Sequence, residues 1–120
     1  MVLHRRLLWI AVALHASTLT AYASFFDGNG LHNLCKTSRA FANGYITGAT
    51  DFNDMNMAAI GEDGKVVVPK KFICIPPGTI VEQVTDVACK YLLDHPEERQ
   101  LPAPVLVYKA LLQAWQCPKQ

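Results

Sequence analysis

The sequence predicts a small all-α protein, a disulfide-stapled helical bundle of about four to five helices with one irregular or short-strand loop. Two observations predict this fold. Apolar residues recur at helical spacing through most of the chain after residue 24. All four cysteines also lie in that part, at positions 35, 74, 89 and 117. The only clear β-branched run is Val66-Val67-Val68, which accounts for the loop.

The first 23 residues have the layout of a secretory signal peptide. Arg5 and Arg6 precede an apolar run over residues 7–14, and Ala21-Tyr22-Ala23 matches a cleavage site. Polar residues interrupt the run well short of the roughly 20 apolar residues that span a bilayer. We therefore expect residues 1–23 to be a cleaved signal, residues 24–120 to form a single exported domain, and the mature protein to have no membrane contact.

The charge of the mature chain argues against nucleic acid as a partner. Removing residues 1–23 of the 120 leaves 97, and the removed part carries Arg5 and Arg6. Nine basic and ten acidic residues remain, and Lys70-Lys71 is their only adjacent basic pair. Binding to nucleic acid depends on clustered Lys and Arg.

A helix is predicted from about residue 80 to residue 93. Thr79 is followed three residues later by Glu82, which is the spacing of a capping box. Apolar side chains then recur on one face at Ile80, Val84, Val87 and Tyr91. His95-Pro96 ends the segment, because proline cannot continue a helix.

A second amphipathic helix follows a short turn. Its apolar face is formed by Val107, Ala110, Leu111 and Ala114, with Pro102 and Pro104 at its entrance. Two helices joined by a short connection pack antiparallel, so Cys74 before the first and Cys117 after the second lie at one end. We expect them to form a disulfide worth on the order of 4 kcal/mol, with Pro76 and Pro77 fixing the backbone beside Cys74.

That pairing leaves Cys35 and Cys89. Cys89 lies on the opposite side of its helix from Tyr91, so a second bridge requires the segment around Cys35 to cover it. Two free thiols are the alternative. The chain has neither a C-x-x-C nor an H-x-x-x-H pattern, so no metal and no cofactor is expected.

The sequence of the front half of the domain predicts two helices. Asp27 and Asn29 can cap the first, in which Leu31, Leu34 and Cys35 have helical spacing. Ser38 can cap the second, whose apolar face is predicted at Phe41, Tyr45, Ala49 and Phe52. Gly44 and Gly48 lie four residues apart in that helix. Since each costs roughly 1 kcal/mol relative to alanine, we expect them to line a close contact, within the domain or between subunits.

The stretch between Asn56 and Phe72, "MAAIGEDGKVVVPKKF", has no helical periodicity. Glu62-Asp63-Gly64-Lys65 is typical of a turn. A loop of this kind is where a helical bundle displays a binding surface. The expected contact residues are Glu62, Asp63, Lys65 and Val66; an ordinary tolerated insertion is the alternative.

No catalytic constellation is evident in the sequence, and an enzyme is not expected. His32 and His95 are the only histidines of the mature chain, and His95 precedes a proline in a polar turn. Exposed helix faces and caps account for the candidate carboxylates Asp51, Asp54, Glu82 and Asp86.

Three segments together resemble the Rap/Tai family of immunity proteins associated with type VI secretion amidase toxins: "LHNLCKTS", "NGYITGATD" and the long stretch from "FICIPPGTIVEQ" to "LLQAWQC". The likeness covers nearly all of the mature chain. Its motif residues, read as structural, are Gly44, Tyr45, Gly48, Asp51, Pro76, Tyr91 and Pro96.

The resemblance implies a small all-helical periplasmic protein, often a homodimer, that binds a cell-wall amidase toxin and blocks its active-site cleft. It also implies the Cys74–Cys117 bridge. Members of the family commonly carry a cysteine where this sequence has Ala42, as the mate of the one at Cys35. Cys89 is the available replacement here. A periplasmic chaperone or envelope-stress protein without a dedicated toxin is the alternative function.

Overall fold

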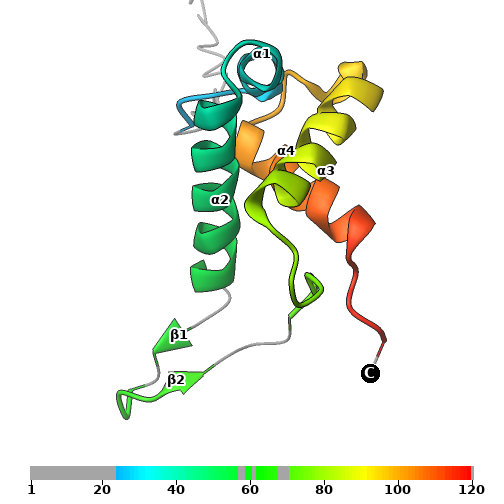
Figure 1. Ribbon diagram of the computed structural model, residues 1–120. Coiled ribbons are helices and arrows are strands. Elements are labelled where there is room, and N and C mark those ends of the chain that lie inside the picture. Colours follow the sequence, from blue (N-terminus) through cyan, green and yellow to red (C-terminus); the bar gives the residue numbers. More distant parts are fainter. Residues whose placement is uncertain (1–23, 57–58, 61, 68–70, 120) are drawn as a thin grey trace, which may run out of the picture.

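The computed structural model describes residues 24–56, 59–60, 62–67 and 71–119, and the predicted signal peptide lies outside this part. Four α-helices form the bundle: α1 (Gly28–Thr37), α2 (Arg39–Asn56), α3 (Val81–Asp94) and α4 (Ala103–Ala114). A short 3-10 helix, η1 (Pro96–Glu98), links α3 to α4, and two short strands, β1 (Ala59–Ile60) and β2 (Val66–Val67), follow α2. The predicted all-α bundle with a short-strand loop is confirmed (Figure 1).

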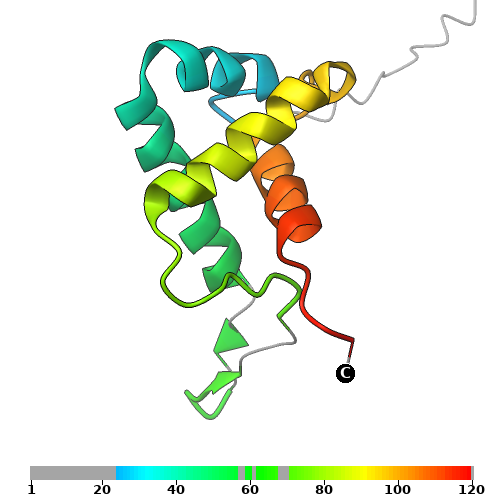
Figure 2. The ribbon, with the colours of Figure 1, turned by 45° about the vertical axis from the view of Figure 1, so that its right-hand side comes forward.

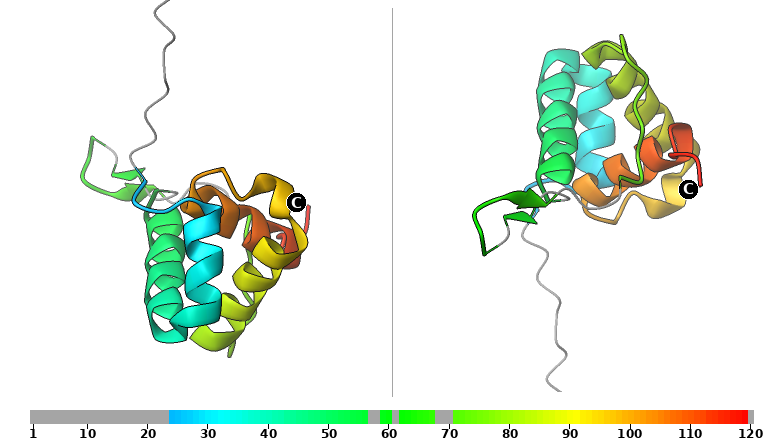
Figure 3. Two further views of the ribbon diagram at one scale, coloured as in Figure 1. Left: turned by 90° about the horizontal axis from the view of Figure 1, so that it is seen from above. Right: turned by 90° about the horizontal axis from the view of Figure 1, so that it is seen from below.

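The helices pack around one core, and the views from above and below show them grouped together (Figure 3). The largest fully buried side chains come from every helix and are Leu31, Ile46, Thr85, Leu92, Leu106, Val107 and Leu111. In α4 the predicted face is buried at Val107, Ala110 and Leu111, while Ala114 at its end is exposed. Among the described helices, none is long and apolar enough to cross a bilayer.

The start of α1 is fixed against the entrance of α4. The Asp27 carboxylate caps α1 by accepting a hydrogen bond from Gly30 N at 2.8 Å, as predicted. Gly28 N donates to Leu101 O at 2.9 Å. A Cβ on Gly28 would lie 2.7 Å from Arg99 Cα, so only glycine allows this approach.

The buried face of α2 differs from the predicted one. Ala42 and Ile46 are fully buried, whereas Phe41 and Phe52 are 54% and 52% exposed. Tyr45 and Ala49 do pack against the core. The helix therefore turns its small and β-branched residues inward, and Phe41 instead packs edge-on against Phe26, with ring centroids 6.0 Å apart.

The predicted close contact at Gly44 and Gly48 is not found among the residues that the structure describes. Both glycines are exposed, and a Cβ added at either would meet nothing within 4 Å. The contact between subunits, the other half of that expectation, stays a prediction. Ser38 does occupy the position before α2, where its carbonyl accepts from Ala42 N at 3.0 Å.

The cap of α3 also differs from the prediction. Thr79 Oγ1 donates to Pro76 O at 2.8 Å and closes the turn around Gly78, whose φ is +86°. The helix begins at Val81, one residue later than expected, so the capping side chain is Gln83, whose Oε1 accepts from Ile80 N at 3.0 Å. The predicted Thr79–Glu82 capping box is therefore wrong, and Ile80 is 57% exposed rather than on the apolar face.

Both predicted disulfides are present. Cys74 and Cys117 are bridged with their Cα atoms 4.9 Å apart, which ties the segment before α3 to the end of α4. Cys35 and Cys89 are bridged with a Cα–Cα distance of 5.8 Å, which ties α1 to the middle of α3. No described cysteine is free.

Candidate functional site

A hairpin projects from the end of the bundle at which α2 finishes (Figure 2). Strands β1 and β2 pair antiparallel, with Ala59 opposite Val67 and Ile60 opposite Val66. Gly64 turns the chain with a φ of +73°, and Asp63 Oδ1 accepts a hydrogen bond from Lys65 N at 3.0 Å. The predicted loop therefore has a defined turn at its tip.

The tip of the hairpin is charged and exposed. Glu62, Asp63 and Lys65 are all exposed, and Lys65 Nζ lies 3.4 Å from Asp63 Oδ2. A surface pair of this kind contributes little to stability, so these side chains are available to a partner. The backbone of the fourth predicted contact residue, Val66, lies in β2.

A cleft lies at the root of the hairpin. The last turns of α2, the segment of residues 71–75 and α4 enclose a volume of about 340 Å³. Its lining residues are Thr50, Asn53, Asp54, Lys71, Ile73, Cys74, Ile75 and Leu111. Tyr108 and Phe72 extend the cleft beside Asn53 and Lys71. The sequence did not single out this cleft, although Ile73 and Ile75 flank Cys74 with the two-residue spacing of an extended segment.

The segment of residues 71–75 is held on one side by the C-terminal tail. Cys117 N donates to Phe72 O at 2.9 Å, and Cys74 N donates to Trp115 O at 2.8 Å. Ile73 and Gln116 lie opposite each other in this antiparallel bridge. Together with the Cys74–Cys117 disulfide, these bonds fix one wall of the cleft to the end of α4.

The family model of the Rap1a immunity proteins matches residues 27–117. The chain belongs to the Rap1a immunity protein family. The match runs from the N-cap of α1 to the last cysteine and so contains all four helices, the hairpin and both disulfides. No curated protein and no solved structure matches the chain.

Membership of the Rap1a family makes this chain an immunity protein against a toxin. Disulfides persist in oxidising compartments. The two bridges and the family together therefore indicate an extracytoplasmic protein.

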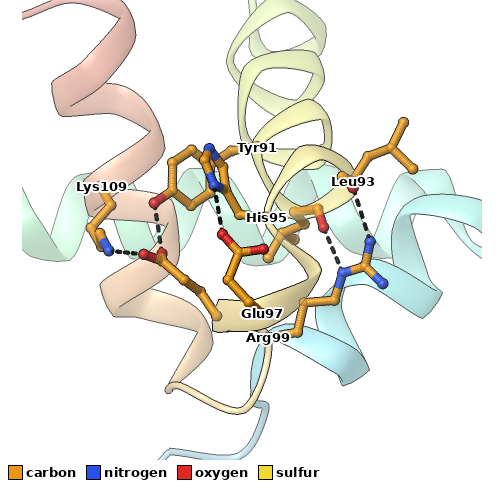
Figure 4. A network of polar contacts seen from close by, with 8 residues as sticks. Tyr91, Leu93, His95, Glu97, Arg99 and Lys109 are labelled. Carbon is orange, nitrogen blue, oxygen red and sulfur yellow. Dashed lines mark hydrogen bonds and ion pairs between the residues drawn. The ribbon is translucent and has the colours of Figure 1, made fainter.

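The motif residue Tyr91 of this Rap1a protein lies beside the corner between α3 and α4 (Figure 4). The motif residue Pro96 begins η1 at that corner. Tyr91 Oη donates to Glu98 Oε2 at 2.7 Å, and Lys109 Nζ donates to Glu98 Oε1 at 2.6 Å. Arg99 caps the end of α3 through bonds to Leu92 O and Leu93 O. The network clamps the corner and includes the motif residue Tyr91.

The pKa values at this corner follow from its contacts. The hydrogen bonds from Lys109 and then from Tyr91 lower the pKa of Glu98, and the bond to Glu98 raises the pKa of Lys109. Burial, followed by the bond to Glu98, raises the pKa of the Tyr91 phenol. Each shift favours the protonation state that keeps the network intact at neutral pH.

The other motif residues do not converge on one site. Gly44, Tyr45, Gly48 and Asp51 lie along α2, and Pro76 lies in the turn before α3. The four candidate carboxylates fall into two groups, Asp51 and Asp54 on α2 and Glu82 and Asp86 on α3. Asp86 pairs with Arg39, Asp51 and Glu82 lie on exposed surfaces, and Asp54 lines the cleft. Burial and the charges of Arg99 and Lys36 lower the pKa of His32. Among the described residues, no group of His, Cys, Asp and Glu side chains could hold a metal ion.

Proposed function

We propose that the mature protein, residues 24–120, acts in the periplasm as a non-catalytic inhibitor of a peptidoglycan-degrading amidase toxin delivered by type VI secretion. The toxin-immunity role of the family supports the type of partner. The projecting hairpin carries the proposal, because a narrow, charged element is suited to enter an active-site cleft and exclude its substrate. In this proposal Glu62, Asp63, Lys65 and Val66 contact the toxin.

The hairpin tip alone is too small for a stable complex. A specific interface buries about 800 Å² on each partner, so neighbouring surfaces must contribute. Phe72, Ile80 and Val81 are each between 42% and 57% exposed near the root of the hairpin and the start of α3. Apolar side chains of this kind suit the centre of an interface, with the charged tip at its rim or in the cleft.

We further propose that two copies pair through the outer face of α2. Gly44 and Gly48 cost helix stability and have no packing partner among the described residues. Exposed Phe41 and Phe52 flank them on the same face. The order Phe, Gly, Gly, Phe is nearly symmetric along the helix, so an antiparallel crossing about a two-fold axis would place each phenylalanine against the partner's helix.

The first test is peptidoglycan hydrolysis by the amidase candidate encoded beside the gene, with and without stoichiometric mature protein from Ser24 onward. We expect loss of hydrolysis together with a stable complex. Full hydrolysis without a complex would overturn the proposal for that toxin. A chaperone role predicts instead that the protein suppresses aggregation of an unrelated client, which a dedicated inhibitor does not do.

A further inference from the structure

Among the described residues, the segment of residues 71–75 has one backbone edge that is hydrogen-bonded and one that is not. The occupied edge bonds the C-terminal tail through Phe72 O and Cys74 N. In an extended segment, successive residues direct their backbone groups to opposite sides. The N–H and C=O of Ile73 therefore point away from the tail, and within the described part of the chain they have no backbone hydrogen-bond partner.

The cleft lies along this same segment. Lys71, Ile73 and Ile75, the alternate residues whose backbone groups face away from the tail, all line it. Unpaired backbone groups beside an open cleft are the arrangement that takes up an extended peptide by strand addition. Segment 71–75 spans roughly 13 Å at about 3.3 Å per residue, which suits a peptide of about four or five residues.

The opposite wall of the cleft supplies a second polar group. Asn53 in α2 lines both parts of the cleft, and its side-chain Nδ2 is buried with no hydrogen-bond partner among the described residues. A carboxamide has both donor and acceptor atoms, so it can bond a peptide group. Leaving such a buried donor unpaired is costly, and a bound peptide would remove this cost.

The rim of the cleft carries both signs of charge. Asp54 and Lys71 are exposed and line the cleft, and no ion pair joins them. Ile73 and Ile75, both half-buried, contribute apolar surface within. The cleft therefore matches a peptide whose backbone is extended and whose side chains are mixed in character.

We propose that this cleft binds an extended segment of the toxin, which adds as a strand to the free edge at Ile73 and bonds Asn53 on the opposite wall. The proposal rests on the inhibitory function proposed above and adds a second contact to the hairpin. In this proposal the hairpin inserts into the toxin, whereas the cleft binds a segment of the toxin. The two contacts lie side by side, because the cleft is at the root of the hairpin.

Residue-resolved hydrogen exchange of the free protein and of its complex with the amidase tests the strand addition. The Cys74 and Cys117 amides are bonded in the free protein, so they should exchange slowly in both states. The Ile73 amide should exchange fast in the free protein and at least about tenfold more slowly in the complex. A complex in which the Ile73 amide stays unprotected overturns strand addition and leaves the inhibitory function standing.

Two substitutions test the same contact by affinity. Ile73→Pro removes the N–H that faces the cleft without removing Phe72 O or Cys74 N. Asn53→Ala removes the opposite amide, and Asn33→Ala, at an exposed site on α1, is its matched control. We expect each cleft variant to weaken the complex about tenfold and the control to leave affinity unchanged. Wild-type affinity in Asn53→Ala with an unprotected Ile73 amide overturns the proposal, and failure of the wild-type protein to form any complex overturns both proposals.

Discussion

Cys35 in α1 and Cys89 in α3 are joined by a disulfide that spans 54 residues of sequence. Ala42 in α2 offers no thiol to Cys35 and is fully buried against the core. The bridge therefore runs from α1 directly to α3 and encloses the whole of α2 and the hairpin between its ends. The Cys74–Cys117 bridge closes a second loop, of 43 residues, that contains α3 and α4.

Replacing either pair of cysteines by serine should lower the free energy of unfolding by about 4 kcal/mol, because each bridge restricts a long loop of the unfolded chain. The two loops, of 54 and 43 residues, differ little in closure entropy, so the two double variants should lose similar amounts. Urea denaturation measures the loss. Wild-type stability in either variant would contradict this, and alkylation of the unreduced wild-type protein should label no thiol.

Sequence patterns predicted α3, α4 and the Cys74–Cys117 bridge because local signals coincide there. Both helices have apolar residues at helical spacing and prolines before or at their N-termini, and a short connection joins them. These signals together leave only the antiparallel arrangement of α3 and α4. The Cys35–Cys89 bridge was less determined. Four cysteines allow three pairings, and the choice depends on how α1 packs across α3, which is a tertiary contact.

Local sequence patterns could predict neither which face of α2 is buried nor the presence of the cleft, because both depend on tertiary contacts. Phe41 and Phe52 form an apolar stripe as regular as that of Ala42 and Ile46, and only packing against the other helices decides which stripe is buried. The cleft joins Asn53 to Ile73 across the hairpin. No spacing rule brings these two residues together.

Substituting Gly44 or Gly48 by alanine should stabilise the monomer by up to about 1 kcal/mol each, since alanine favours the helix and the added Cβ enters open space. Gly28→Ala is the opposite case, because its Cβ would clash with Leu106 and the backbone of Arg99. We expect it to destabilise the fold by about 1–3 kcal/mol. Thermal unfolding of the three variants compares them, and stabilisation by Gly28→Ala would contradict the close contact.

The proposed pairing of two copies through α2 predicts that Gly48→Arg is a folded monomer. A long charged side chain at the centre of a close helix crossing would separate the helices and place an unpaired charge between them. Sedimentation equilibrium should give the mass of a dimer for the wild-type protein and of a monomer for the variant. A wild-type monomer, or a variant that remains dimeric, would exclude this face.

Glu98→Gln should make stability less dependent on pH in the acid range. The contacts from Lys109 and Tyr91 lower the pKa of Glu98 below its usual value of 4.5. As the pH falls, the unfolded chain therefore binds this proton before the folded one does. The stabilising contribution is complete above pH 4.5 and is lost as the pH falls through the lower folded pKa.

Thermal unfolding between about pH 3 and pH 7 compares the two proteins. The variant should be less stable than the wild type at neutral pH, and the two curves should converge in acid. His32 contributes a separate decline that starts near pH 6.5, because its pKa is lowered in the fold. This decline is common to both proteins and cancels in the difference. Parallel curves would contradict the role of Glu98.

Replacing Glu62, Asp63 and Lys65 together by serine should weaken toxin binding without unfolding the domain. All three residues are exposed on the hairpin, and their single ion pair is a surface pair, so the unfolding temperature should hardly change. We expect a loss of affinity of about ten- to a hundredfold, mostly through slower association, since charges at a rim steer encounter.

The matched control replaces Lys90, Asp94 and Glu97, an equally charged and exposed set on α3 and η1 that also contains one ion pair. Titration calorimetry and stopped-flow association with the amidase should separate the two sets, with only the hairpin variant impaired. Unchanged affinity in the hairpin variant would remove the hairpin tip from the interface. Equal losses in both would point to long-range charge attraction rather than contact, because the two sets lie on different parts of the surface and share only their charge.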